Sequence, residues 1–176
     1  MIRVNNNIKT GIFIFIIFFL SLPLFSGSSA AGELDGTMWF MFMPSLKNGR
    51  EDIDDSVPMS FKEIQHDGSA IKGIYGLGET ELSFNGILKK LKNGYEFRII
   101  VQDNSGNMTF TGKLTAVSKE GYSPKGRFEQ MMVETATSKG VKILWKITNA
   151  TLHGSREFTG TGRTTFKLSG FIIKPK

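Results

Sequence analysis

The side chains that could act as catalysts or metal ligands are few in this chain and lie far apart. It contains no cysteine and two histidines, His66 and His153, each beside a turn. Without cysteine there are no disulfides, thiolate metal sites or thiol nucleophiles. Two turn histidines that lack a ligand spacing such as His-x-x-x-His do not predict a metal site.

Acidic residues and glycines form further patterns, and none of them predicts a reaction. Glu79 and Glu81 share one face of an expected strand, whereas acid–base catalysis needs burial or coupling. The acidic stretch 50–55 lacks the spacing of a calcium loop, and the glycines of 73–78 do not lead from a strand into a helix. The sequence therefore favours a binding protein over an enzyme and predicts no catalytic residue and no cofactor.

The first thirty residues have the order of a secretory signal peptide. Arg3 and Lys9 precede an apolar run at 12–22, Pro23 ends this run, and small residues follow at 26–31. The run is shorter than the roughly 20 residues of a membrane-spanning helix. We therefore expect cleavage within the small residues, export to a bacterial periplasm or the medium, and no transmembrane span in the mature chain.

With 1–30 as the signal peptide, residues 31–176 are expected to form a single domain. Its length of about 145 residues is enough for a hydrophobic core. The formal charge of +6 falls to +4 when Arg3 and Lys9 are removed, and the remaining basic residues are scattered. Nucleic-acid-binding domains usually carry a dense basic patch, so we expect no nucleic-acid partner.

Alternating apolar and polar residues, typical of half-buried strands, run through most of this domain. The clearest alternation lies at 80–88, 95–102, 108–116 and 158–168. Further strands are expected at 37–43, 57–64, 70–77, 121–133, 141–152 and 171–174. Tight turns such as Asn93-Gly94 predict an antiparallel meander. The expected fold is all-β, with about eight to ten strands closed into a small barrel, because closure removes strand edges.

Two segments near the start of the domain leave alternatives open. Residues 45–56 form the one long connection, either a lid over one barrel end or a solvated loop. The run Met38 to Met43 is apolar on both faces. It is either a strand buried on both sides or an exposed apolar patch, which a contact between subunits of a homo-oligomer would bury.

A Phe-x-Gly pattern recurs on one face of the expected strands. It occurs at Phe84, Phe110 and Phe158, and the pair is reversed in Gly126-Arg127-Phe128. Glycine on the inner face of a barrel lets a strand bend and makes room for a neighbouring ring. The alternative is that these glycines leave space for a ligand.

Aromatic side chains dominate the expected inner face of the barrel. Core packing is their usual role, although a pocket among them would bind a small hydrophobic molecule. A barrel of about eight strands either fills with side chains or holds one small ligand, and the sequence leaves both open. The residues predicted to line such a pocket are Trp39, Phe61, Tyr75, Phe84, Phe97, Phe110, Phe128, Trp145 and Phe166.

The opening Gly36-Thr37-Met38-Trp39, followed by a series of hairpins, resembles the lipocalin/calycin superfamily, and the outline is similar to avidin-type barrels. Lipocalins carry Gly-x-Trp in their first strand and an arginine late in the barrel that packs over the tryptophan. The resemblance implies these parts for Trp39 and for Arg163 or Arg156, and it implies a small apolar ligand. The spacing here is Gly-x-x-Trp, and helical periodicity is almost absent from the mature chain.

Three hypotheses of function result. The first is binding of a small hydrophobic ligand inside the barrel, favoured by an interior cavity of about 300 Å³ or more. The second is a filled barrel that acts as a protein-interaction or structural module of the cell envelope, favoured by a solid core. The third is a cofactor-free enzyme of the cyclase or isomerase type, favoured by a buried carboxylate or tyrosine beside a cavity.

Overall fold

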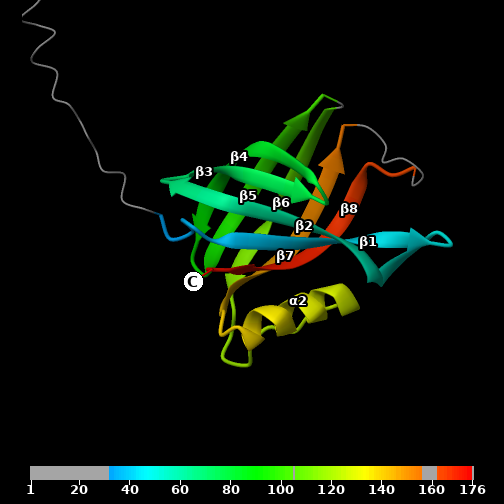
Figure 1. The fold of residues 1–176 in the computed structure, drawn as a ribbon. Coiled ribbons are helices and arrows are strands. Elements are labelled where there is room, and N and C mark those ends of the chain that lie inside the picture. Colours follow the sequence, from blue (N-terminus) through cyan, green and yellow to red (C-terminus); the bar gives the residue numbers. More distant parts are fainter. Residues whose placement is uncertain (1–31, 105, 156–161, 176) are drawn as a thin grey trace, which may run out of the picture.

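The alternating segments of the sequence form the wall of a closed antiparallel barrel in a computed structural model of the protein (Figure 1). The structure describes residues 32–104, 106–155 and 162–175. Each strand pairs with the next, and the last pairs with the first. The elements are β1 (Met38–Lys47), β2 (Arg50–Asp67), β3 (Ala70–Leu77), β4 (Thr80–Leu91), β5 (Gly94–Asp103), β6 (Gly106–Ala116), α2 (Arg127–Ser138), β7 (Ile143–Gly154) and β8 (Thr165–Ile173).

The all-β meander expected from the sequence is thus confirmed, with eight strands. The sequence predicts two separate strands at 158–168 and 171–174. The structure has one strand here, because β8 runs without interruption from Thr165 to Ile173. Residues 156–161 lie outside the described part of the chain. Among the described residues, no helix is both long and apolar enough to cross a membrane.

Residues 45–56, expected to form a loop or lid, belong instead to a long hairpin. β1 continues to Lys47, and Asn48 and Gly49 make the turn with positive φ angles of 52° and 75°. A two-residue turn of this kind matches the twist of paired strands. The alternation does not reveal these strands because their side chains are mostly exposed, in a hairpin that extends beyond the barrel wall (Figure 1).

A bulge interrupts the pairing within this hairpin. Pro44 lies opposite Ser56, but the next residue, Ser45, lies opposite Asp52, so 53–55 are extra residues on β2. Proline has no N–H to donate to the neighbouring strand, and bulges are common where a strand loses its pairing. Two of the extra residues, Ile53 and Asp54, contact the start of α2.

The expected strand at 121–133 is wrong. This segment is irregular up to Gly126 and then forms the first turns of α2. Gly126-Arg127-Phe128 is therefore no strand repeat, and Phe128 is 37% exposed on the helix rather than on the inner face of the barrel. Residues with good helix propensity, including Glu129, Gln130 and Met131, outweigh the weak alternation here.

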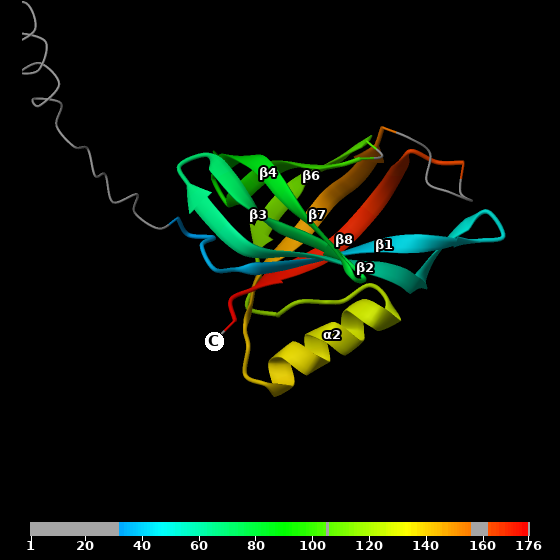
Figure 2. The same ribbon diagram turned by 45° about the horizontal axis from the view of Figure 1, so that its top comes forward.

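The helix explains why β1 is apolar on both faces. Trp39 and Met41 belong to the barrel core, whereas Phe42 packs outside the barrel with Phe171 and Ile173 of β8. The partly buried side chains of this outer cluster are Met38, Phe40, Tyr122, Met132, Val133, Val141 and Ile143. Figures 1 and 2 show α2 across this side of the barrel. The strand is therefore buried on both sides.

Glycines on the inner face make room for neighbouring side chains, as the Phe-x-Gly pattern predicts. A Cβ at Gly112 would lie 2.8 Å from the ring of Phe97 and 2.9 Å from the Cβ of Ala150. A Cβ at Gly86 would lie 2.7 Å from the carbonyl oxygen of Arg98. These separations are shorter than van der Waals contact, so both positions require glycine. Phe158 lies outside the described residues.

Candidate functional site

Most of the aromatic residues predicted to line a pocket lie in the barrel core. Those that are at most 2% exposed are Trp39, Phe61, Tyr75, Phe84, Phe97, Phe110 and Phe166. Trp145 is partly buried and packs edge-on against Tyr95, with ring centroids 5.8 Å apart. Phe128 is the exception, because it lies on α2 outside the barrel.

These rings pack against one another. The ring centroid of Phe61 lies 5.3 Å from that of Phe84 and 5.1 Å from that of Phe110, and both contacts are edge-on. The ring centroids of Trp39 and Phe97 are 5.5 Å apart. Such distances and angles are those of favourable aromatic contacts. The aromatic side chains therefore pack together as a core, and a ligand role for them stays a prediction.

One polar group inside this core has no partner. The hydroxyl of Tyr75 is buried and forms no hydrogen bond with any described residue. Burial, with a smaller effect from the charge of Asp103, raises the pKa of Tyr75 to about 12. The phenol is therefore neutral at physiological pH.

The segment that precedes β1 packs across one end of the barrel. Leu34 is fully buried there, and Gly36 donates a backbone hydrogen bond to the carbonyl oxygen of Ile64 at 3.0 Å. The indole nitrogen of Trp39 donates to the hydroxyl of Thr37 at 3.0 Å, and this hydroxyl donates to the carbonyl oxygen of Leu34 at 2.6 Å. The Gly-x-x-Trp motif thus helps to close the barrel.

Neither histidine is placed as a metal ligand. The Nε2 atom of His66 lies 3.0 Å from the carbonyl oxygen of Gly68 and must carry the proton, and Nδ1 accepts from the N–H of Leu34 at 3.4 Å. His153 Nδ1 lies 3.0 Å from the hydroxyl of Thr165. In the described part of the chain, no three His, Asp or Glu side chains gather in a group that would hold a metal ion.

Arg163 does not cover Trp39, in contrast to what the lipocalin resemblance implies. Its guanidinium lies over the ring of Phe166, 5.1 Å from the centroid, and pairs with Glu51 of the hairpin at 3.1 Å. Trp39 lies near the other end of β8, opposite Ile172. Arg156 lies outside the described residues.

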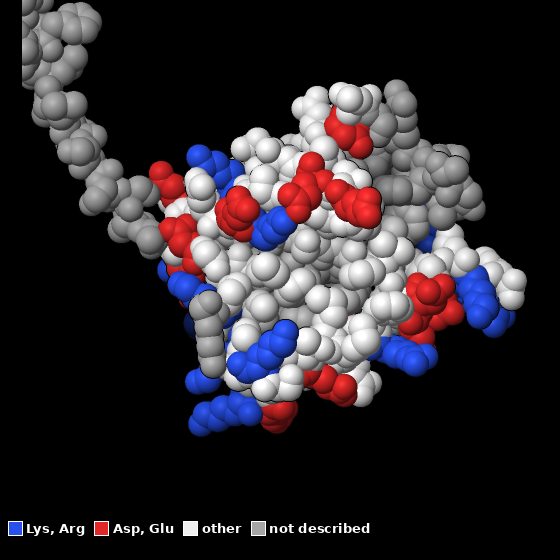
Figure 3. Space-filling view, viewed as in Figure 1, with Lys and Arg blue, Asp and Glu red and all other residues white. Residues whose placement is uncertain are grey.

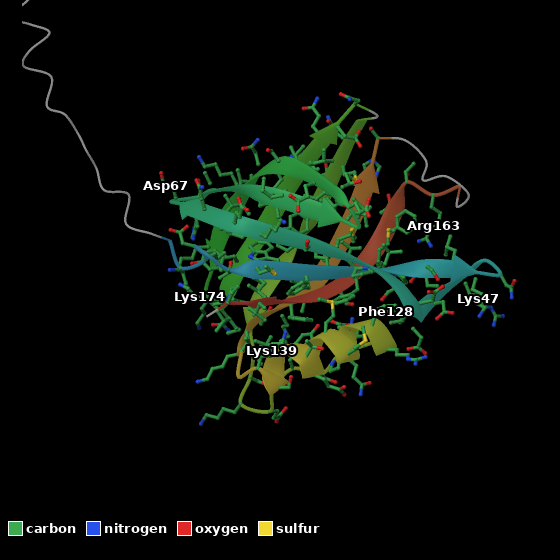
Figure 4. The ribbon with its side chains drawn as sticks, viewed as in Figure 1. Lys47, Asp67, Phe128, Lys139, Arg163 and Lys174 are labelled. Atoms are coloured by element: carbon green, nitrogen blue, oxygen red, sulfur yellow. The ribbon has the colours of Figure 1, made fainter. Side chains whose placement is uncertain are left out.

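A cavity of about 200 Å³ lies outside the barrel, between the β1–β2 hairpin, β8 and the start of α2. We call it the α2 cavity. Its lining includes Phe42, Pro44, Ile53, Ser56, Lys125, Glu129 and Lys167. In Figure 4, Phe128 marks the end of α2 nearest to the hairpin, and Lys139 marks the other end.

Glu129 is buried beside this cavity, with 1% of its surface exposed. Its Oε1 accepts a hydrogen bond from the Tyr122 hydroxyl, and its Oε2 accepts from the backbone N–H of Lys125 at 2.9 Å and from the Ser169 hydroxyl at 3.1 Å. Burial, and then the carboxylate of Glu129, raise the pKa of Tyr122 well above its usual range. Through its hydrogen bond with Ser169, Glu129 thus links α2 to β8.

Ser56 is one of the residues that line the same cavity, and it carries a buried polar group without a partner. Its side chain is 6% exposed, and its hydroxyl forms no hydrogen bond with the described residues. A buried hydroxyl without a partner costs about 1–3 kcal/mol, so such groups in native proteins call for an explanation such as a bound molecule. Among the described residues that line this cavity, Ser56 is the one whose buried side chain lacks a hydrogen-bond partner.

Charged side chains surround the opening of the α2 cavity. Lys125 and Lys167 are exposed, and neither forms an ion pair within the described ranges. The carboxylate of Glu51 is paired with Arg163. Elsewhere on the face shown in Figure 3, acidic and basic side chains are interspersed.

The walls of the α2 cavity are held in place by direct contacts. The carboxylate of Asp54 accepts a hydrogen bond from the backbone N–H of Arg127 at 3.2 Å. A Cβ at Gly126 would lie 2.4 Å from the carbonyl oxygen of Ile53, so only glycine allows this close approach of the helix to the hairpin. The cavity is thus formed by segments that already contact each other.

A larger groove of about 450 Å³ crosses the outer face of β4, β5, β6 and β7. Ile87, which is 60% exposed, and Arg98 line it. Among the described residues, the buried side chains without a hydrogen-bond partner are Ser56 and Tyr75, and neither lies in this groove. Of these two residues, Ser56 lines a cavity, and we therefore place the candidate site in the α2 cavity.

Only weak signals of this site are present in the sequence. Tyr122 and Glu129 fall within the segment expected to be a strand, and the acidic stretch 50–55 suggests no more than a calcium loop, whose spacing it lacks. A glutamate three residues after Gly126 is typical of the first turn of a helix, and this signal alone points to α2.

Comparisons with models of protein families, with curated proteins and with solved structures find no significant match to the chain.

Proposed function

We propose that this protein is an exported barrel of the lipocalin/calycin type that binds a small molecule in the α2 cavity rather than along the barrel axis. The observation that carries the proposal is the buried, unpartnered hydroxyl of Ser56 in the wall of a cavity. The apolar and polar lining of that cavity supports it, since ligand sites combine both. The signal-like residues 1–30 support export.

The packing of the core weakens the first hypothesis, that of an interior hydrophobic ligand. The rings around Phe61 contact one another at ordinary aromatic distances. A ligand in that region would have to displace side chains that fill it, and such repacking is costly. The α2 cavity needs no such displacement.

A buried carboxylate beside a cavity, such as Glu129, would favour an enzyme, but its contacts favour a structural role. All three of its hydrogen bonds come from the protein itself, namely from Tyr122, Lys125 and Ser169. A general acid or base must exchange a proton with a substrate. We therefore propose no reaction.

The proposal is tested by NMR on the exported form of the protein, titrated with a library of small fragments. We expect shifts of backbone amide signals to cluster at Ser56, Gly126 and Ser169. Ser56→Val, which removes the hydroxyl, should weaken this binding, whereas Ser83→Val on the exposed face of β4 should not. Shifts centred on Tyr75 and Phe110 would contradict the proposal and restore the interior site.

Export is tested separately, by fractionating producing cells and determining the N-terminus of the mature protein. We expect the protein outside the cytoplasm, beginning at Ala31 or Gly32. A cytoplasmic protein that retains its first thirty residues would contradict export.

A further inference from the structure

We infer that the α2 cavity takes a small organic carboxylate, a molecule with an apolar body and one carboxylate group. The inference rests on the proposed function and adds the chemical class of the ligand. It follows from the lining of the cavity, considered in three parts: the apolar walls, the charges at the opening, and the hydroxyl of Ser56.

The walls of the cavity favour an apolar ligand body. Phe42 and Pro44 of β1 are buried and line one side. Ile53, in the bulge of β2, also lines it and is 45% exposed. Covering an exposed isoleucine with a ligand removes apolar surface from water, which is favourable. A fully hydrated ion such as inorganic phosphate would gain nothing from these contacts.

The charges at the opening favour an anionic group. Glu51 is neutralised by Arg163, and Glu129 already accepts three hydrogen bonds. Among the described residues, neither Lys125 nor Lys167 forms an ion pair with an acidic side chain. The groups left to interact with a ligand are therefore mainly cationic donors, and these form strong hydrogen bonds with a carboxylate.

The hydroxyl of Ser56 and the size of the cavity narrow the class further. A serine hydroxyl can donate to a carboxylate oxygen. The volume of about 200 Å³ is below the roughly 300 Å³ at which sites for drug-sized ligands begin. A single ring or a short chain fits such a space, whereas a fatty acid or a retinoid does not.

The inference is tested by NMR titration of the exported protein with benzoate and with benzamide, which has the same shape and no charge. We expect benzoate to bind at least about tenfold more tightly, which corresponds to about 1.4 kcal/mol. Its affinity should fall as salt is added, because ions screen the lysines.

Charge variants provide the matched control. Lys125→Gln and Lys167→Gln should each weaken benzoate binding several-fold and leave benzamide binding unchanged. Lys72→Gln, on the exposed face of β3, should change neither. All three positions are exposed, so folding is not at risk.

The outcomes separate the inference from the proposed function. Equal affinity for the two probes, with shifts at Ser56 and Ser169, would overturn the carboxylate class and keep the proposed site. Shifts from neither probe at these residues would overturn the inference, and the fragment titration then decides whether the proposed function fails as well. Benzoate binding that is insensitive to both lysine variants would also overturn it.

Discussion

The carboxylate of Asp54 accepts a hydrogen bond from the backbone N–H of Arg127 at 3.2 Å, across 73 residues of chain. The first N–H groups of a helix have no partner within the helix, and a side chain at the N-cap position usually supplies one. Here the N-cap is Gly126, which has no side chain. The bulge of β2 supplies the missing acceptor, so the hairpin and α2 stabilise each other.

Asp54→Ala should therefore destabilise the protein by about 1 kcal/mol, within the range measured for loss of a helix cap. Urea unfolding followed by circular dichroism measures the effect. Glu120→Ala removes the same charge from an exposed position before α2 and should leave the free energy of unfolding unchanged. Equal effects of the two variants would show that charge, and not the cap, is responsible.

Glu129→Gln should loosen the attachment of α2 to the barrel. The glutamine amide has one acceptor oxygen and one NH₂ group, so it cannot accept from Tyr122 at one side and from Lys125 and Ser169 at the other. We expect a loss of about 1–3 kcal/mol and faster amide hydrogen exchange in α2. Glu134→Gln, exposed on the same helix, is the control, and an equal loss there would contradict the special role of Glu129.

Two tyrosines should respond in opposite ways to loss of the hydroxyl. Tyr75→Phe removes a buried hydroxyl without a partner and should leave stability unchanged or raise it by up to about 1 kcal/mol. Tyr95→Phe removes a hydroxyl that donates to Glu33 at 2.7 Å and should lower stability by about 0.5–1.5 kcal/mol. A loss of stability in Tyr75→Phe would show that its hydroxyl has an interior partner, such as a water molecule or a ligand.

Because of Tyr75, the free energy of unfolding should also change with pH in the alkaline range. Burial raises the pKa of Tyr75 from the ordinary 10.0 to about 12 in the folded protein, so the folded state holds its proton more tightly than the unfolded chain. The resulting stabilisation is complete below pH 10 and is lost as pH rises towards 12.

Urea unfolding at a series of pH values from 10 to 12 tests this in the wild type and in Tyr75→Phe. The variant should lose stability less steeply, because one group with a raised pKa is gone. Tyr95→Phe provides a comparison, since the pKa of Tyr95 is also raised to about 12, by burial and by Glu33. Identical slopes in wild type and Tyr75→Phe would contradict the prediction.

The sequence by itself determined most of the strands and their order. Alternation in segments such as 95–102 reflects the opposite faces of a strand, and turns such as Asn93-Gly94 reflect local backbone geometry. Both are properties of neighbouring residues, so they can be recognised without knowledge of the rest of the chain. The burial of Trp39 and Phe97, and the need for Gly112, follow from the same pattern.

Only the tertiary structure decided where the candidate site lies. Glu129 and Ser56 are 73 positions apart in the chain, and they line one cavity because α2 folds onto β1 and β8. The sequence does not reveal the helix because the alternation at 121–133 favours a strand, and the position of its apolar side, with Met132 and Val133, is set by the outer face of the barrel. The segment 45–56, expected to be a loop or lid, is part of a hairpin instead. Asp54 in the bulge of this hairpin accepts a hydrogen bond from the first N–H of α2. No local pattern encodes such contacts, since each depends on a partner distant in sequence.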